Sequence, residues 1–236
     1  MIFEDYVDEL NALQAVSKRL KTIYDAKRKS LPFYLALSGG ETAKKLFSFW
    51  VEKYKEEMDW NRFRFFWVDE RCVPPTDKDS NFGYADNLLF TPMGIKEEHV
   101  FRIHGEDIPE KEASRYSQII TSHLPVYNGL PHFDCIILGV GADAHTASIF
   151  PNAMSLLTDT RLYAVSHHPQ SGQFRITITG PMILNHVPLL VPVLGSGKDD
   201  MIATLKIGYS ETNRTPAAYV LSHAQTAFVF TSTSAL

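Results

Sequence analysis

The chain has 236 residues, of which 44% are hydrophobic and 21% charged, and its formal net charge is −4. This composition supports a sizeable buried core and excludes a disordered chain. The negative charge also argues against a nucleic-acid-binding protein, because such proteins neutralise phosphates with basic surfaces. Any phosphate that the chain binds is therefore expected to belong to a small molecule.

Cys72 and Cys135 are the only cysteines. They show neither CxxC spacing nor a disulfide framework, so we expect a reduced, cytoplasmic protein. The first residues are acidic where a signal peptide needs basic ones, and the most apolar later stretch, residues 187–194, is short and contains two prolines. We therefore expect neither a membrane nor a nucleic acid among the partners. The sequence leaves the oligomeric state open, between a monomer and a small homo-oligomer.

Apolar residues recur at three- and four-residue steps from Phe3 to Tyr24, which predicts that the chain opens with an amphipathic helix. Residues 32–37 are then typical of a buried strand. The loop at 38–42 leads into a second helix, whose apolar face includes Trp50. This order of elements is one β-loop-α unit.

The next predicted strand spans residues 63–68. Two prolines prevent regular structure from continuing after it, so residues 69–75 are expected to form a loop. Residues 80–90 and 110–123 are predicted to be helical. Ser80 is a suitable N-cap for the first of these helices, because its hydroxyl can satisfy a free backbone amide.

Further apolar runs predict the remaining strands. They lie at residues 133–138, 162–166, 174–179, 189–194 and 227–231. Strands that alternate with helices favour an α/β fold with a doubly wound, mostly parallel sheet and helices on both faces. No repeat, low-complexity tract or long linker marks a boundary. We therefore expect a single α/β domain over residues 1–236, with a small subdomain in the C-terminal half as the alternative.

Ser38, Gly39 and Gly40 follow the first predicted strand. They offer a hydroxyl, unobstructed backbone amides and the positive end of a helix dipole, which together suit a phosphate. The alternative is a tight turn with an N-cap, since glycine turns are common connections in α/β folds. The loop lacks the spacing and the lysine of a nucleotide P-loop.

Three cationic residues also stand at the ends of predicted elements. Arg71 follows the strand at 63–68, where a guanidinium could contact a phosphate or an oxygen that becomes negative during a reaction. An ordinary surface ion pair is the alternative. Lys198 starts a predicted helix and could reach an anion in front of the sheet, whereas Arg175 begins a strand and could simply pair with a carboxylate.

The segment GVGADAH at residues 139–145 is the most informative one in the chain. A buried strand ends there by delivering Asp143 and His145 into a tight turn, and open α/β sheets bind ligands at the carboxyl ends of their strands. The segment also fits the relaxed dinucleotide pattern GxGxxA, but Pro151 shortens any helix begun near Thr146, which disfavours an NAD site. A turn carboxylate beside a buried structural histidine is the remaining alternative. No HExxH or Cys/His cluster is present, so no metal site is expected.

Read together, these motifs resemble the family of 6-phosphogluconolactonases and glucosamine-6-phosphate isomerases. The motifs are LSGGET at 37–42, DERCVP at 69–74, NFGYADN at 81–87, GVGADAHTASIFP at 139–151, RIT at 175–177, GK at 197–198 and PAA at 216–218. Their order and spacing match the lactonases, and they cover nearly the whole chain.

The resemblance implies hydrolysis of 6-phospho-D-glucono-1,5-lactone to 6-phospho-D-gluconate in the oxidative pentose phosphate pathway. It also implies a fold shared with glucosamine-6-phosphate deaminase and ribose-5-phosphate isomerase, and neither a metal nor an organic cofactor. We expect His145 to act as the general base, with Asp143 orienting it and Arg71 stabilising the developing oxyanion. The expected phosphate pocket consists of Ser38, Gly39, Gly40, Arg175 and Lys198.

Ala144 departs from the family, which usually has glycine in its Asp-Gly-His sequence. Its Cβ disfavours a positive φ, so either the residue is not left-handed or the turn is strained. Two other functions stay open. A sugar-6-phosphate isomerase or deaminase is one, although the chain lacks the Glu of the deaminase sequence His-Ile-Ala-Phe-Asn-Glu-Pro and has Arg71 where deaminases typically carry Tyr. A non-catalytic sugar-phosphate sensor, suggested by Ala144, is the other.

Overall fold

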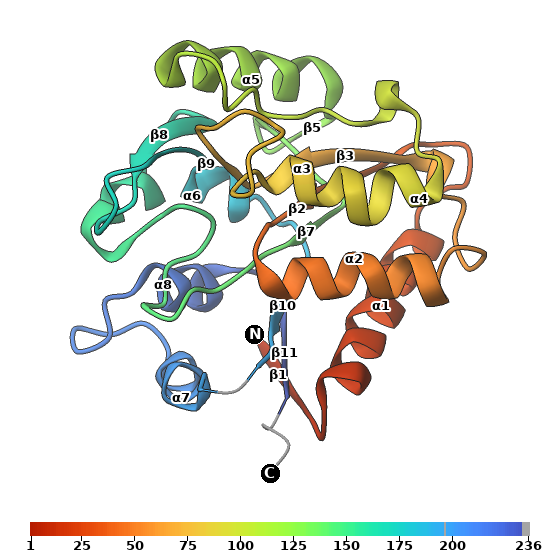
Figure 1. The fold of residues 1–236 in the computed structure, drawn as a ribbon. Coiled ribbons are helices and arrows are strands. Elements are labelled where there is room, and N and C mark those ends of the chain that lie inside the picture. The colour runs from red at the N-terminus through yellow and green to blue at the C-terminus, as the bar shows by residue number, and fades with distance from the viewer. Residues whose placement is uncertain (196, 233–236) are drawn as a thin grey trace.

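Six parallel strands form the central sheet of the computed structural model, which describes residues 1–195 and 197–232 (Figure 1). Across the sheet they follow the order β1-β11-β10-β7-β2-β3. Their bounds are β1 Ile2–Tyr6, β2 Phe33–Leu37, β3 Phe63–Trp67, β7 Cys135–Ile137, β10 Leu189–Val193 and β11 Ala227–Ser232. The predicted parallel sheet is therefore confirmed.

The order of the strands reverses between β2 and β7. From β2 the chain proceeds to β3 at one edge, whereas from β7 it proceeds through β10 to β11 in the opposite direction. Every residue of β7 and β10 is buried, as expected for strands that are covered on both faces. Loops that leave the carboxyl ends of strands at such a reversal diverge and leave a crevice between them. The loops after β2 and β7 carry Ser38 and His145.

Helices cover both faces of the central sheet, with α1 and α2 on one side and α7 and α8 on the other (Figure 1). The helices are α1 Glu9–Ala26, α2 Glu41–Lys53, α3 Asn81–Ala85, α4 Thr91–Met93, α5 Pro109–His123, α6 Gly180–Ile183, α7 Asp199–Ile207 and α8 Pro216–His223. Short 3-10 helices span Trp60–Arg62, Glu97–His99 and Pro151–Leu157, and a π-helical turn at Asp86–Phe90 continues α3. The predicted cap is confirmed, since the Ser80 hydroxyl accepts a hydrogen bond of 3.0 Å from the amide of Gly83.

The chain opens with a strand, so the predicted helix is wrong in its first part. β1 pairs with β11 at the edge of the sheet. α1 begins only at Glu9, after Asp8, whose carboxylate accepts a hydrogen bond of 2.7 Å from the amide of Asn11. The first apolar residues fit a helical spacing, but their backbone pairs with nearly the last segment of the chain. Local periodicity carries no information about such a distant partner.

A second, antiparallel sheet stands beside the first. It contains β4 (Asp69–Arg71), β9 (Phe174–Ile178) and β8 (Tyr163–His167), in that order, and α5 packs against β8 and β9. The loop predicted at 69–75 is therefore wrong for its first three residues. A separate two-stranded hairpin joins β5 (Val126–Tyr127) to β6 (Leu130–Pro131).

Val68 connects the two large sheets. Its amide donates a hydrogen bond of 2.9 Å to the carbonyl of Leu37 in the first sheet, and its carbonyl accepts one of 2.7 Å from the amide of Ile178 in the second. The strand that contains β3 thus continues as β4 into another sheet, because β9 supplies a new partner there. This continuation places Arg71 in front of the parallel strands.

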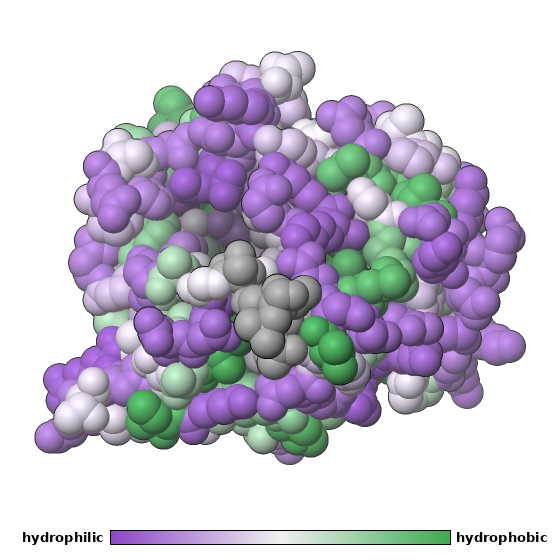
Figure 2. Space-filling view, turned by 60° about the horizontal axis from the view of Figure 1, so that its bottom comes forward, coloured by the Kyte–Doolittle hydropathy of each residue, from purple (hydrophilic) through white to green (hydrophobic). Residues whose placement is uncertain are grey.

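The described residues include no helix that is long and apolar enough to span a membrane. On the face shown in Figure 2, hydrophilic side chains predominate and the apolar ones form separate patches.

Candidate active site

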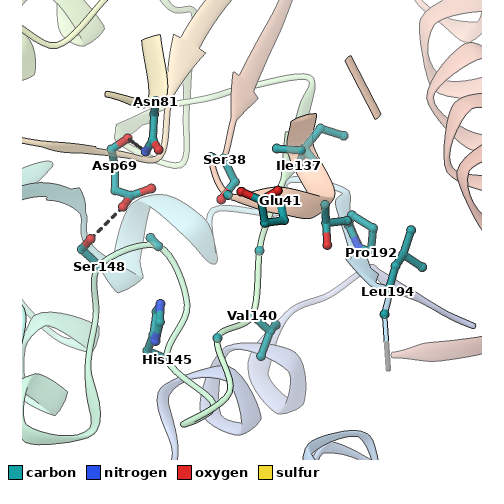
Figure 3. A pocket seen from close by; sticks show the side chains of 18 of the residues that line it. Ser38, Glu41, Asp69, Asn81, Ile137, Val140, His145, Ser148, Pro192 and Leu194 are labelled. Atoms are coloured by element: carbon teal, nitrogen blue, oxygen red, sulfur yellow. Dashed lines mark hydrogen bonds between the residues drawn. The ribbon is translucent and has the colours of Figure 1, made fainter. Parts of the chain in front are cut away.

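A cavity of about 560 Å³ lies at the carboxyl ends of the parallel strands, a size typical of small-molecule sites. Of the eight residues singled out in the sequence, seven line it: Ser38, Gly39, Gly40, Arg71, His145, Arg175 and Lys198. The eighth, Asp143, holds the ring of His145 by a hydrogen bond. In Figure 3, Asp69 and Ser148 lie at the left, Pro192 and Leu194 at the right, and Ser38 between them.

The loop after β2 provides backbone donors at one side of the cavity. Gly40, with φ at 91°, precedes the first turn of α2, and no side chain caps that turn. The free amides and the positive end of the helix dipole are therefore available to an anion. Gly39 is required by close packing, because a Cβ there would lie 1.8 Å from Oδ1 of Asn81.

The imidazole of His145 is held by Asp143. Nδ1 of the ring lies 2.5 Å from the Asp143 carboxylate, which also accepts a hydrogen bond of 3.2 Å from the His145 amide. Burial favours a raised pKa for Asp143, but the charge and hydrogen bonds of His145 outweigh it and lower the pKa. An ionised Asp143 keeps the proton of a neutral ring on Nδ1, so Nε2 is free to accept a proton.

Two neighbours fix the position of the His145 ring. A Cβ at Gly141 would lie 2.1 Å from Cε1 of His145, so only glycine allows the ring to pack there. On another side, the centre of the Phe150 ring lies 4.8 Å from the centre of the imidazole. The resemblance to deaminases aligns their glutamate with Phe150, so an apolar ring stands here in place of a carboxylate.

Ala144 adopts the left-handed conformation, with φ at 58°. Its side chain is buried, its amide donates to the carbonyl of Gly141, and its carbonyl accepts a hydrogen bond of 3.0 Å from the amide of Ala217. These contacts hold the turn in a conformation that costs an alanine about 1–2 kcal/mol. Of the two alternatives that the sequence left open, the strained turn is the one observed.

Arg71 and Arg175 stand opposite each other on β4 and β9. Nε of each guanidinium is buried without a hydrogen-bond partner, and among the described residues neither arginine forms an ion pair with a carboxylate. Arg71 does donate to the carbonyl of Asp79, at 2.6 Å. Burial and the charge of Arg71 lower the pKa of Arg175. Two guanidiniums side by side, with Nε of each buried, form a strong site for an anion.

Lys198 belongs to a different group of charges. Burial and the nearby charge of Lys45 lower the pKa of its ammonium, and Glu9 opposes this shift. Lys45 itself pairs with Glu9 at 2.5 Å. Glu9, Lys45 and Lys198 all line the cavity. The cavity therefore contains two groups of cationic side chains, the arginine pair and Lys198 with the Glu9–Lys45 ion pair. The sequence did not predict that the cations form two separate groups, nor that Glu9 and Lys45 line the cavity.

Asp69 and Glu70 connect the second sheet to α3. Ser148 donates a hydrogen bond of 2.7 Å to Asp69, and the side-chain amide of Asn81 donates one of 3.0 Å to the Asp69 carbonyl (Figure 3). The Glu70 carboxylate accepts hydrogen bonds from the Ser80 hydroxyl and from the amides of residues 71, 81 and 82. Burial nevertheless raises the pKa of Glu70 to about 7.

Outside the cavity, the described residues contain one cluster with the spacing of metal ligands, His104, Asp107 and Glu112. Both oxygens of the Glu112 carboxylate already accept hydrogen bonds from Arg115, at 2.5 and 2.7 Å. The cluster therefore has the character of an ion-pair network.

Fold and cavity together define a class of protein. It is a doubly wound α/β protein whose cavity is lined by cationic side chains and lies where the strand order of the sheet reverses. The model of the family described as glucosamine-6-phosphate isomerases/6-phosphogluconolactonase matches residues 8–229. The chain belongs to this family, as the motifs predicted.

Comparisons with individual proteins give the same family. The 6-phosphogluconolactonase of Treponema pallidum (strain Nichols) is 43% identical over 205 residues, which are 86% of this chain and 82% of that protein. The chain in the crystal structure of devB protein has 34% sequence identity to this chain and a TM-score of 0.87. The match covers 99% of this chain and 98% of that one. A monomeric glucosamine-6-phosphate deaminase of the NagB superfamily is 18% identical with a TM-score of 0.83 over 100% and 98% of the two chains, and shows the fold alone. The predicted likeness to the deaminase fold is confirmed.

Replacing Ala144 by glycine is expected to raise the free energy of unfolding by about 1 kcal/mol, because the left-handed conformation strains alanine but not glycine. The matched control is Ala142→Gly in the same loop, at an exposed position without a positive φ, where stability should fall by about 0.5 kcal/mol. Urea-induced unfolding measures both changes. Destabilisation by Ala144→Gly as well would show that the turn is unstrained.

Glu70 is expected to make stability depend on pH. Between its ordinary pKa of 4.5 and the folded value of about 7, the folded chain keeps a proton on Glu70 that the unfolded chain releases. The free energy of unfolding should therefore fall as pH rises through this window, by up to about 3 kcal/mol. Glu70→Gln should flatten the slope and the exposed Glu56→Gln should not, in urea unfolding at pH 5 and pH 7. An unchanged slope in Glu70→Gln would assign the pH dependence to other groups.

Proposed function

We propose that this chain hydrolyses 6-phospho-D-glucono-1,5-lactone to 6-phospho-D-gluconate, in the oxidative pentose phosphate pathway. The observation that carries the proposal is the shared cavity. An oriented imidazole faces the same space as a helix N-terminus with Lys198 and a pair of arginines that form no ion pair with a carboxylate among the described residues. A phosphorylated sugar lactone needs this combination, because one end is a dianion and the other becomes negative during hydrolysis. The chain's free cysteines agree with a cytoplasmic location.

His145 is the general base in this proposal. Nε2 takes a proton from water while the water oxygen forms a bond to the lactone carbonyl carbon, and the charge moves to the carbonyl oxygen. The guanidinium of Arg71 donates to that oxygen, an interaction of the kind worth about 3–4 kcal/mol in a preorganised site. When the intermediate collapses, the bond to the ring oxygen breaks. The imidazolium returns its proton to the departing oxygen, and the product keeps a carboxylic acid that ionises.

The phosphate is placed at the other side of the cavity. Ser38, Gly39 and Gly40 contribute the hydroxyl and amides, and Lys198 contributes the cation. Arg175, assigned from the sequence to the same pocket, stands instead beside Arg71. We therefore place it where the product carboxylate forms, and this assignment refines the one made from the sequence.

Deamination is the competing function. The ring-opening step of an amino-sugar phosphate needs acid catalysis, and Phe150 occupies the position aligned with the deaminase glutamate. Ester hydrolysis needs no acid at that position, so the aromatic ring favours the lactonase. Ammonia release from glucosamine 6-phosphate by the purified chain would support the deaminase instead.

His145→Ala is expected to lower kcat by about 10²–10⁴-fold with little change in KM, because the variant loses the base but keeps the phosphate pocket. A pH-stat assay on freshly generated lactone, with chelator present and corrected for spontaneous ring opening, measures both constants. The control is His123→Ala, at an exposed position on α5. Undiminished turnover in His145→Ala would remove the base assignment. If the wild-type chain binds 6-phosphogluconate but does not hydrolyse the lactone, the result would support the sugar-phosphate sensor instead.

Lys198→Ala is expected to raise KM by about 10- to 100-fold and to leave kcat within a few-fold, because a charged hydrogen bond to the phosphate is lost in both ground and transition states. Lys206→Ala is the matched control, since Lys206 lies on α7 and pairs with Asp5 outside the cavity. The same assay, run over a range of lactone concentrations, gives KM. A fall in kcat at constant KM would move Lys198 to the reacting end.

A further inference from the structure

His168 is a cavity residue to which neither the sequence motifs nor the proposed mechanism assigns a role. It lies at the base of the hairpin between β8 and β9. The hairpin is closed by two backbone hydrogen bonds, from the His168 amide to the carbonyl of Gln173 at 3.0 Å and from the amide of Gly172 to the His168 carbonyl at 2.9 Å. The backbone that carries the imidazole is thereby fixed.

Hydrogen bonds also fix the protonation of the His168 ring. Nδ1 accepts from the amides of Gln170 and Ser171, at 3.4 and 3.2 Å. A nitrogen that accepts cannot carry the proton, so the neutral ring has its proton on Nε2. Burial and the positive charge of Arg175 lower the pKa of His168, which favours this neutral form. Among the described residues Nε2 has no hydrogen-bond partner.

The position of His168 places it with the reacting groups. Its ring meets the Phe150 ring edge-on at 5.2 Å between centres, and the same Phe150 ring packs against His145 at 4.8 Å. The charges that act on His168 are those of Arg175, His145, Asp143 and Arg71, whereas the charges that act on Lys198 are those of Lys45 and Glu9. His168 therefore stands at the lactone end of the cavity.

We propose that Nε2–H of His168 donates a hydrogen bond to the substrate hydroxyl on C2, next to the lactone carbonyl. The inference rests on the proposed function. The arginine pair offers charged donors to the oxygen that becomes negative, so a donor that stays neutral matches an uncharged hydroxyl nearby. His168 is thus a specificity-determining residue, which selects sugars that carry this hydroxyl and positions C1 in front of His145.

The test compares two substitutions of His168 with one control. His168→Gln keeps an N–H donor near the position of Nε2, whereas His168→Phe keeps the ring and removes the donor. We expect kcat/KM for the lactone to fall about 10-fold in His168→Phe and by less than about threefold in His168→Gln. The control is His167→Gln, because His167 is exposed and its ring packs on Phe174, at 4.3 Å between centres.

A substrate without the hydroxyl separates recognition from a structural role. On the 2-deoxy lactone, the wild-type chain should lose the same factor of about 10, and His168→Phe should lose little more. Equal losses by His168→Phe on both substrates, each relative to the wild-type chain on the same substrate, would overturn the inference while the lactonase stands. An unchanged kcat/KM of His168→Phe for the lactone that carries the hydroxyl would overturn it as well. Should His168→Phe fail to fold, an undiminished wild-type rate on the 2-deoxy lactone would overturn it equally. A wild-type chain with no turnover of either lactone would overturn the proposed function together with the inference.

Discussion

The reversal of strand order between β2 and β7 is the constraint on which the site depends. Parallel strands release their loops at one edge, and the reversal keeps the loops after β2 and β7 from covering the space between them. The two loops are still in close contact: a Cβ on Gly139 would lie 3.0 Å from Oγ of Ser38. The turn proposed to bind phosphate and the turn proposed to carry the catalytic residues can therefore contact one small molecule only because these strands are neighbours.

The second sheet completes the cavity with charge. A doubly wound sheet alone would place the loops but not Arg71 and Arg175, which need the antiparallel pairing of β4 with β9 to stand side by side. Burial and the neighbouring charge of Arg71 both lower the pKa of Arg175, so holding the two guanidiniums together costs electrostatic energy. Bound carboxylate or oxyanion would relieve the repulsion. The same hairpin of β8 and β9 carries His168, so this hairpin brings both the charged donor of Arg175 and the donor of His168 to the cavity.

The backbone is strained at the turn that carries Asp143 and His145. Ala144 is left-handed between the two proposed catalytic residues, and its contacts with Gly141 and Ala217 hold it there. Such strain persists only where the surroundings fix the backbone, and here they also fix the pairing of Asp143 with His145. The left-handed alanine therefore costs the turn energy, and the hydrogen-bonded pair of Asp143 and His145 is present nevertheless.

The sequence by itself determined the elements whose signals are local. Continuous apolar runs marked the buried strands, Ser80 marked a helix start, and the glycine turns after two strands placed Ser38 and His145 at the correct edge. Only the tertiary structure decided what depends on distant partners. β1 and β4 are strands because β11 and β9 lie beside them, and Arg175 joins Arg71 instead of Lys198 for the same reason. Periodicity reports how a segment buries its own side chains, whereas strand pairing and the grouping of charges are set by segments far away in the chain.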